Sequence, residues 1–209
     1  MTPPADAAAR WDPLHPREAS ALLSHLPSPW WVAGGWAIDL FLGHQGRPHK
    51  DLDIGILRGS TRQTLAAMPD WEFFEASGGI LSGPLAGDPR PNVNSLWGRP
   101  RHTRAWRLEL MLDDSDGEQW IFRRDRSVRR ALSLAIRRDG EGIPYLAPEI
   151  QLLYKASGTR AEDEADFTRA APRLSEESRR WLGDALARAH PQHPWRSVIL
   201  PAAAAAPAR

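Results

Sequence analysis

The chain has 209 residues, a hydrophobic fraction of 42%, a charged fraction of 25% and a formal net charge of +1. This composition is typical of a globular protein and excludes a disordered one, and the near-zero net charge argues against reliance on bulk attraction to nucleic acid. Zero cysteines exclude disulfides and thiolate zinc sites. Because the chain has no long apolar run and no signal-peptide pattern at its start, we expect a cytoplasmic protein without a membrane span.

The first half of the chain is predicted to alternate helices with strands. Its apolar spacing and breakers predict helices over about 16–26, 36–42 and 62–68, and strands over about 30–33, 51–57 and 71–76. The segment 78–101 is rich in Gly, Pro and Asn, so we expect a long loop where an acceptor molecule would be held. Trp97 in that loop is a candidate stacking surface.

The second half begins with a hairpin and ends in helices. Residues 105–113 alternate, with Leu108, Leu110 and Leu112 on one face and Glu109 and Asp113 on the other. A turn over 114–117 leads to a partner strand over 119–123. Helices are predicted over 149–156, 160–170 and 175–189, with a proline at the start of the first and Ser175 capping the third.

These elements predict an α+β fold in which a mixed sheet flanked by helices precedes a small C-terminal helical bundle. We expect a core over residues 12–145, a helical subdomain over 146–200, and flexible tails over 1–11 and 201–209.

Two carboxylates on one strand are the strongest chemical signal. Asp51 and Asp53 are two residues apart, so both are expected on the same face. Carboxylates so close repel one another unless a cation neutralises them. A hard divalent cation, Mg²⁺ above all, is the natural occupant, with water and substrate phosphates completing its shell.

A phosphate site is predicted beside these carboxylates. Gly34 and Gly35 lie between a strand and a helix, where glycine lets the backbone approach a ligand and the helix N-terminus offers free N–H groups. Arg47 lies in the same short stretch of sequence and is a candidate ligand for the phosphates. The alternative is that Arg47 and the nearby His49 are ordinary polar residues of a loop.

The segment GGWAIDLFLG…RPHKDLDI resembles the nucleotidyltransferases of the DNA polymerase β superfamily, whose signature is a Gly-Gly or Gly-Ser turn, a short helix and a D-x-D strand. Trp36 after the two glycines is similar to the branch of aminoglycoside and lincosamide adenylyltransferases. The likeness implies a third carboxylate from a later strand, here Glu109, which would complete the metal site or act as general base, with Asp113 as a rival on the same face. The segment APEIQLLYKASGTRAEDEADF resembles the family's phosphate-binding part and implies that Lys155 contacts the triphosphate.

Several other charged residues have two interpretations. Asp39 is expected to be a helix cap or a helix-surface carboxylate, and Asp163 and Asp166 are expected to be surface acids on a helix instead of ligands. The arginine-rich segment, defined as the seven arginines of residues 123–138, is expected to be a solvated face, or else to attract a triphosphate or an anionic acceptor. Its members are Arg123, Arg124, Arg126, Arg129, Arg130, Arg137 and Arg138.

The resemblance implies Mg²⁺-dependent transfer of a nucleoside monophosphate, with ATP or another nucleoside triphosphate as co-substrate, to a hydroxyl of a small, aminoglycoside-like molecule. Two alternatives remain open, namely a nucleotidyltransferase acting on RNA or a protein hydroxyl, and a relative that binds nucleotide without catalysis. The sequence leaves the acceptor, the base of the nucleotide and the oligomeric state undefined.

Overall fold

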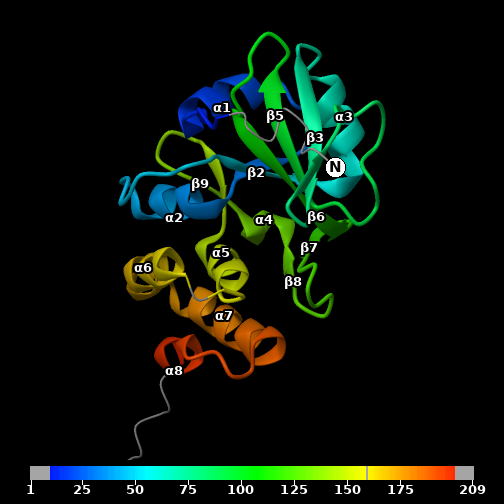
Figure 1. Ribbon diagram of the computed structural model, residues 1–209. Helices are drawn as coiled ribbons and strands as arrows, with labels where there is room; N and C mark the ends of the chain where they lie inside the picture. Colours follow the sequence, from blue (N-terminus) through cyan, green and yellow to red (C-terminus); the bar gives the residue numbers. More distant parts are fainter. Residues whose placement is uncertain (1–9, 159, 201–209) are drawn as a thin grey trace, which may run out of the picture.

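A computed structural model describes residues 10–158 and 160–200 of the chain. Its sheet of ten strands has the order β4-β3-β5-β6-β2-β1-β10-β9, with β7 joining β6 to β8. Figure 1 shows helices α5 to α8 gathered on one side of the molecule, below the sheet in this view, and α1 and α3 toward the opposite end. The expected α+β fold with C-terminal helices is therefore confirmed.

The N-terminal part supplies three helices and six strands in the described residues. They are α1 (Pro16–Leu23), β1 (Trp30–Val32), α2 (Gly34–Leu42), β2 (Asp53–Leu57), α3 (Thr61–Ala66), β3 (Trp71–Ser77), β4 (Ile80–Ser82), β5 (Ser95–Pro100) and β6 (Leu108–Asp116), with the 3-10 turn η2 (Arg58–Ser60) before α3.

The remaining elements form the end of the sheet and the helical layer. They are β7 (Gln119–Ile121), β8 (Arg129–Ala131), α4 (Leu132–Ala135), β9 (Ile136–Arg138), β10 (Pro144–Leu146), α5 (Pro148–Lys155), α6 (Ala161–Ala170), η3 (Ala171–Arg173), α7 (Glu176–Ala189) and α8 (Trp195–Ile199). Pro148 begins α5 and the Ser175 hydroxyl accepts the Ser178 N–H at the start of α7, as the sequence predicts.

Strand β6 lies between β2 and β5 and shows the predicted alternation. Leu108, Leu110 and Leu112 are fully buried in the core. Glu109 on the other face is only partly buried, whereas Asp113 on that face is buried as well. The reason is α5, which covers this end of the strand and donates the Tyr154 hydroxyl to Asp113 at 2.7 Å.

Two sequence expectations about strands are wrong. Strand β2 begins at Asp53, so Asp51 lies before the strand and is exposed. The expected loop 78–101 contains β4 and β5, which pair with β3, and β5 also pairs with β6. The glycine and proline content of this segment predicts a loop, but strand formation here depends on pairing with strands that are distant in sequence, which a local composition does not reveal. Trp97 consequently packs edge-on against Trp11 and Trp106 instead of standing in a loop.

The short strands β8, β9 and β10 and the helix α8 were not expected. Each has five residues or fewer, and β10 is held by parallel pairing with β1, which is remote in sequence. Of the expected tails, 1–9 and 201–209 lie outside the described residues, while Trp11 forms a bridge with Trp106. Over the described ranges, no helix has the length and apolarity that a bilayer span requires.

Candidate active site

A cavity of about 650 Å³ collects most of the predicted site residues. Its walls come from the start of α2, the segment before β2, strand β6, the segment after β7, and helices α5 and α6. Of the predicted residues, it is lined by Gly34, Gly35, Arg47, Asp51, Asp53 and Lys155. Glu109 is not among the lining residues, although its neighbours on the same face of β6, Met111 and Asp113, are. The fold thus gathers residues that are more than 120 positions apart.

The Asp53 carboxylate lies directly against Gly34. A Cβ built on Gly34 would lie 2.0 Å from Asp53 Oδ2, and Gly34 has a φ of +65°. Glycine is needed here both for the left-handed backbone and for this close approach. The Gly-Gly signature therefore makes room for a carboxylate.

The strand register distinguishes the two rivals for the third carboxylate. Strands β2 and β6 are parallel, with Asp53 opposite Glu109 and Leu57 opposite Asp113. Side chains opposite one another share a face, so Glu109 is the neighbour of Asp53, whereas Asp113 lies four residues, or about 13 Å, farther along. The geometry therefore favours Glu109.

Electrostatics at the carboxylates show an excess of negative charge. Removal from water, with repulsion from Glu109 and Asp51, raises the pKa of Asp53 well above its usual range. Burial and the charge of Asp51 likewise raise the pKa of Glu109, although the Ser95 hydroxyl donates to Glu109 at 2.6 Å. A bound cation would relieve this repulsion.

The donor set fits a hard cation that also binds substrate. Among the described residues, no three His, Asp or Glu side chains are arranged to enclose a metal ion by themselves. Two carboxylates completed by water and phosphate oxygens are the usual setting of Mg²⁺ in phosphoryl-transfer sites. Asp51 and Asp53, which both line the cavity, are the residues that would hold such an ion.

The N–H of Gly34 already has a partner. It donates to the Gln151 side-chain oxygen of α5 at 2.8 Å, which links the turn to the helical layer. A Cβ on Gly35 would meet Arg47 Nη2 at 2.2 Å and the His49 ring at 2.6 Å. Both glycines thus allow close packing of side chains, and phosphate contact by their backbone stays a prediction.

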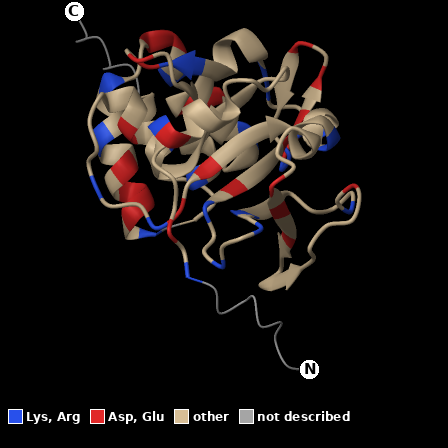
Figure 2. Ribbon diagram, turned by 90° about the horizontal axis from the view of Figure 1, so that it is seen from above, with Lys and Arg blue, Asp and Glu red and all other residues tan. Residues whose placement is uncertain are grey.

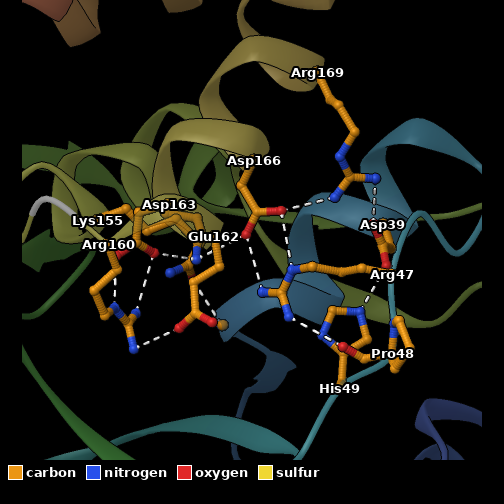
Figure 3. A network of polar contacts seen from close by, with 12 residues as sticks. Asp39, Arg47, Pro48, His49, Lys155, Arg160, Glu162, Asp163, Asp166 and Arg169 are labelled. Carbon is orange, nitrogen blue, oxygen red and sulfur yellow. Dashed lines mark hydrogen bonds and ion pairs between the residues drawn. The ribbon is translucent and has the colours of Figure 1, made fainter.

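Lys155 lies in a buried ion cluster. Its Nζ is 2.8 Å from Asp163 Oδ1 and 2.9 Å from Asp166 Oδ2, and the Asp166 side chain is 0% exposed. Burial alone would raise the pKa of Asp166, but hydrogen bonds from Arg47, Lys155 and Arg169 outweigh it and lower the pKa to about 2. Figure 3 shows these side chains from α5, α6 and the segment before β2 pointing toward one another.

The cluster continues to helix α2. Arg169 Nη1 is 2.9 Å from Asp39 Oδ1, and His49 Nε2 is 2.6 Å from Asp39 Oδ2. Asp39 is 2% exposed. The loop that carries Arg47 and His49 is thereby fixed between α2 and α6, on the wall of the cavity that Asp51 and Asp53 also line.

The expected surface positions of Asp39, Asp163 and Asp166 are therefore wrong. All three are buried and ion-paired. A signal was present in α6, where Asp163, Asp166, Phe167 and Ala170 occupy positions i, i+3, i+4 and i+7 of one helix face, and all four are buried. Gln151 and Arg160, which also line the cavity, had no comparable signal in the sequence.

The arginine-rich segment is only partly the solvated face that was expected, with Arg124, Arg126, Arg129 and Arg138 exposed and the other three at least partly buried. Arg130 is buried against Glu149 at 2.8 Å, and Arg137 bonds the same carboxylate at 3.1 Å. Arg126 and Arg129 pair with Asp114 and Asp116. Acidic and basic segments alternate across the whole fold (Figure 2), consistent with the net charge of +1.

Comparison with known proteins identifies similar sequences and folds. The family aminoglycoside-2''-adenylyltransferase matches residues 17–75. A lincosamide resistance protein of Staphylococcus haemolyticus is 33% identical over 49 residues, which are 23% of this chain and 30% of that relative. The sequence match therefore spans less than a third of the relative's length.

Solved structures match over a larger part of the chain. The lincomycin-bound lincosamide antibiotic adenylyltransferase LnuA has a TM-score of 0.52 at 17% identity, covering 74% of this chain and 92% of that one. ANT(2")-Ia in complex with adenylyl-2"-tobramycin has a TM-score of 0.54 at 16% identity, covering 82% and 95%. The predicted nucleotidyltransferase-type fold and the resemblance to the antibiotic adenylyltransferase branch are confirmed.

Proposed function

We propose that this protein transfers a nucleoside monophosphate, AMP from ATP, to a hydroxyl group of a small molecule in a Mg²⁺-dependent reaction. The observation that carries the proposal is the set of carboxylates Asp51, Asp53 and Glu109, which repel one another beside a cavity rich in cationic side chains. A protein without a cation to bind has no reason to keep these charges together.

Asp51 and Asp53 would hold the metal ion, with nucleotide phosphates completing its shell. Mg²⁺, when bound, neutralises charge at the reacting phosphate and lowers the cost of the attacking oxygen's negative charge. Arg47 and Lys155 lie on the cavity wall beside Asp53 and would orient the triphosphate, together with the Gly34-Gly35 turn.

Glu109 would accept the proton of the acceptor hydroxyl as general base, since its raised pKa suits that role. The acceptor oxygen then forms a bond to the α-phosphorus, the bond to the bridging oxygen breaks, and pyrophosphate leaves. Fixed charges and positioning supply most of the rate enhancement in such phosphoryl transfers.

The alternative of an RNA or protein acceptor depended mainly on the arginine-rich segment. Four of its arginines form ion pairs within the fold, namely Arg126, Arg129, Arg130 and Arg137. Paired arginines contribute little to a continuous basic surface, which binding along a nucleic acid requires. A small acceptor in the cavity is therefore the better-supported proposal.

The test is calorimetric titration of a non-hydrolysable ATP analogue with and without Mg²⁺. We expect saturable binding by the wild type that weakens at least 100-fold without Mg²⁺ and in the Asp51→Asn/Asp53→Asn variant. A matched control is Asp88→Asn/Asp116→Asn, which removes two exposed carboxylates paired with Arg62 and Arg129. Equal binding with and without Mg²⁺, or no binding by the folded wild type, would refute the proposal.

A further inference from the structure

Arg123 differs from the other arginines of the arginine-rich segment. Arg124 donates to the Tyr154 carbonyl at 3.0 Å, Arg138 donates to the Gly142 carbonyl at 2.7 Å, and the other four form the ion pairs described above. Within residues 10–158 and 160–200, no ion pair or hydrogen bond of the Arg123 side chain is found, and its buried Nη1 has no hydrogen-bond partner. A buried guanidinium N–H group without a partner is rare and calls for an explanation, and an arginine that lines a cavity is a ready donor to an oxyanion.

The structure holds Arg123 in place without an anion. It follows β7 and lines the cavity together with Arg124. Its guanidinium carbon lies 5.1 Å from the centre of the Tyr154 ring, and Tyr154 is itself fixed by its hydrogen bond to Asp113. Stacking on an aromatic ring orients the guanidinium while leaving its N–H edge available.

The cations of the cavity divide into two groups. Lys155 and Arg160 are the positive charges that act on Asp53, and each is already bonded to the carboxylate of Asp163. Arg123 instead stacks on Tyr154, whose hydroxyl donates to Asp113 of strand β6. Because Asp113 lies four residues beyond Glu109, the residue opposite Asp53, Arg123 lies along β6 away from Asp51 and Asp53, in the part of the cavity left for the acceptor.

We propose that Arg123 binds an oxyanion of the acceptor, which therefore carries a carboxylate or phosphate group in addition to the reacting hydroxyl. This inference rests on the proposed transfer reaction. The neighbouring Arg124 adds a second positive charge to the same wall of the cavity, and charge repulsion therefore disfavours binding of a polycation such as tobramycin there. Asp113 is about 13 Å along β6 from Glu109, so we expect the anion within about that distance of the hydroxyl.

Inorganic phosphate is the probe for the test, and arginine side-chain Nε–Hε signals of the ¹⁵N-labelled protein are the readout. The titration is made with the ATP analogue and Mg²⁺ at saturation, so that the triphosphate side is occupied. We expect a saturable shift of one arginine signal, absent from Arg123→Gln, and phosphate binding at least tenfold weaker in that variant. Arg126→Gln, which removes a surface arginine paired with Asp114, should bind phosphate like the wild type.

Three results would overturn the inference. The first is phosphate affinity that is equal in wild type and Arg123→Gln, and the second is micromolar binding of tobramycin to the wild type. The third is a tenfold loss of affinity for the ATP analogue in Arg123→Gln, which would assign the arginine to the nucleotide. Arg123→Lys, which retains the charge and should fold, is expected to show intermediate phosphate binding.

Failure of the proposed function gives a different pattern. The phosphate titration is repeated without nucleotide, where we expect the Arg123 signal to shift as well. A protein that binds no ATP analogue but still binds phosphate at Arg123 would refute the transfer reaction while retaining the oxyanion site.

Discussion

The substitution Lys155→Met tests the buried ion cluster. It removes the cation that bonds Asp163 and Asp166 at 2.8 and 2.9 Å, where the lysine side chain is 6% exposed. Breaking a buried ion pair from one side costs about 3–5 kcal/mol because a buried charge loses its partner. Arg160 still bonds Asp163, and Arg47 and Arg169 still bond Asp166, so we expect the low end, about 3 kcal/mol. For a chain of this length that corresponds to a fall in Tm of roughly 6–12 °C.

The acid dependence of stability gives an independent check of the same cluster. The pKa of Asp166 is lowered from its ordinary 3.8 to about 2 in the folded protein. A lowered folded pKa means that the stabilisation, about 2.5 kcal/mol, is fully present above pH 4 and is lost as the pH falls toward 2. In Lys155→Met the pKa of Asp166 rises, so the loss of stability on acidification becomes smaller.

The assay is urea unfolding at pH 7 and at pH 3, with Lys50→Met as the matched control. Lys50 is an exposed lysine on the wall of the same cavity, and its substitution should change the free energy of unfolding by no more than about 0.5 kcal/mol. The reasoning is refuted if Lys155→Met is as stable as Lys50→Met at pH 7.

Two further predictions concern the carboxylate site. In Gly34→Ala the new Cβ would lie 2.0 Å from Asp53 Oδ2 at a φ of +65°, so we expect a loss of about 2 kcal/mol or more in urea unfolding and loss of Mg²⁺-dependent binding of the ATP analogue. Gly43→Ala is the control, because Gly43 has a similar φ of +77° but open space around its Cβ. Its free energy of unfolding should fall by about 1–2 kcal/mol while its binding of the ATP analogue is kept. Equal loss of binding in both variants would contradict the role of the Gly34 contact with Asp53. In Asp53→Asn the repulsion with Glu109 and Asp51 is relieved, so without Mg²⁺ its Tm should exceed that of the wild type at pH 7. The raised pKa of Asp53 means that the wild type loses stability as the pH rises and Asp53 ionises. The Tm difference between Asp53→Asn and the wild type should therefore shrink on acidification. Equal Tm values for the two proteins at pH 7 would contradict this prediction.

The sequence by itself determined the local elements and the type of chemistry. Regular apolar spacing predicted α1, α5, α6 and α7 because each helix buries one face, and the alternation of β6 predicted Glu109 on the face opposite the core leucines. The Gly-Gly turn and the two aspartates were predicted to belong to one site from their chemistry and the family resemblance. The contact of Gly34 with Asp53 is itself made by the antiparallel pairing of β1 with β2.

Only the tertiary structure decided which distant residues meet. The parallel register of β2 and β6 places Glu109, and not Asp113, opposite Asp53, and no pattern within either strand contains that register. Charges were the least predictable part, since Arg123 has the local signature of a surface residue and the only sign of burial at Asp166 is its position on the apolar face of α6. Whether a charged side chain is paired depends on neighbours brought together by chain folding, because Coulomb interactions act through space and are strengthened where water is excluded. The physical reason that Asp166 is paired and Arg123 is left with an unused donor therefore lies in the packing of α5 and α6 against the sheet.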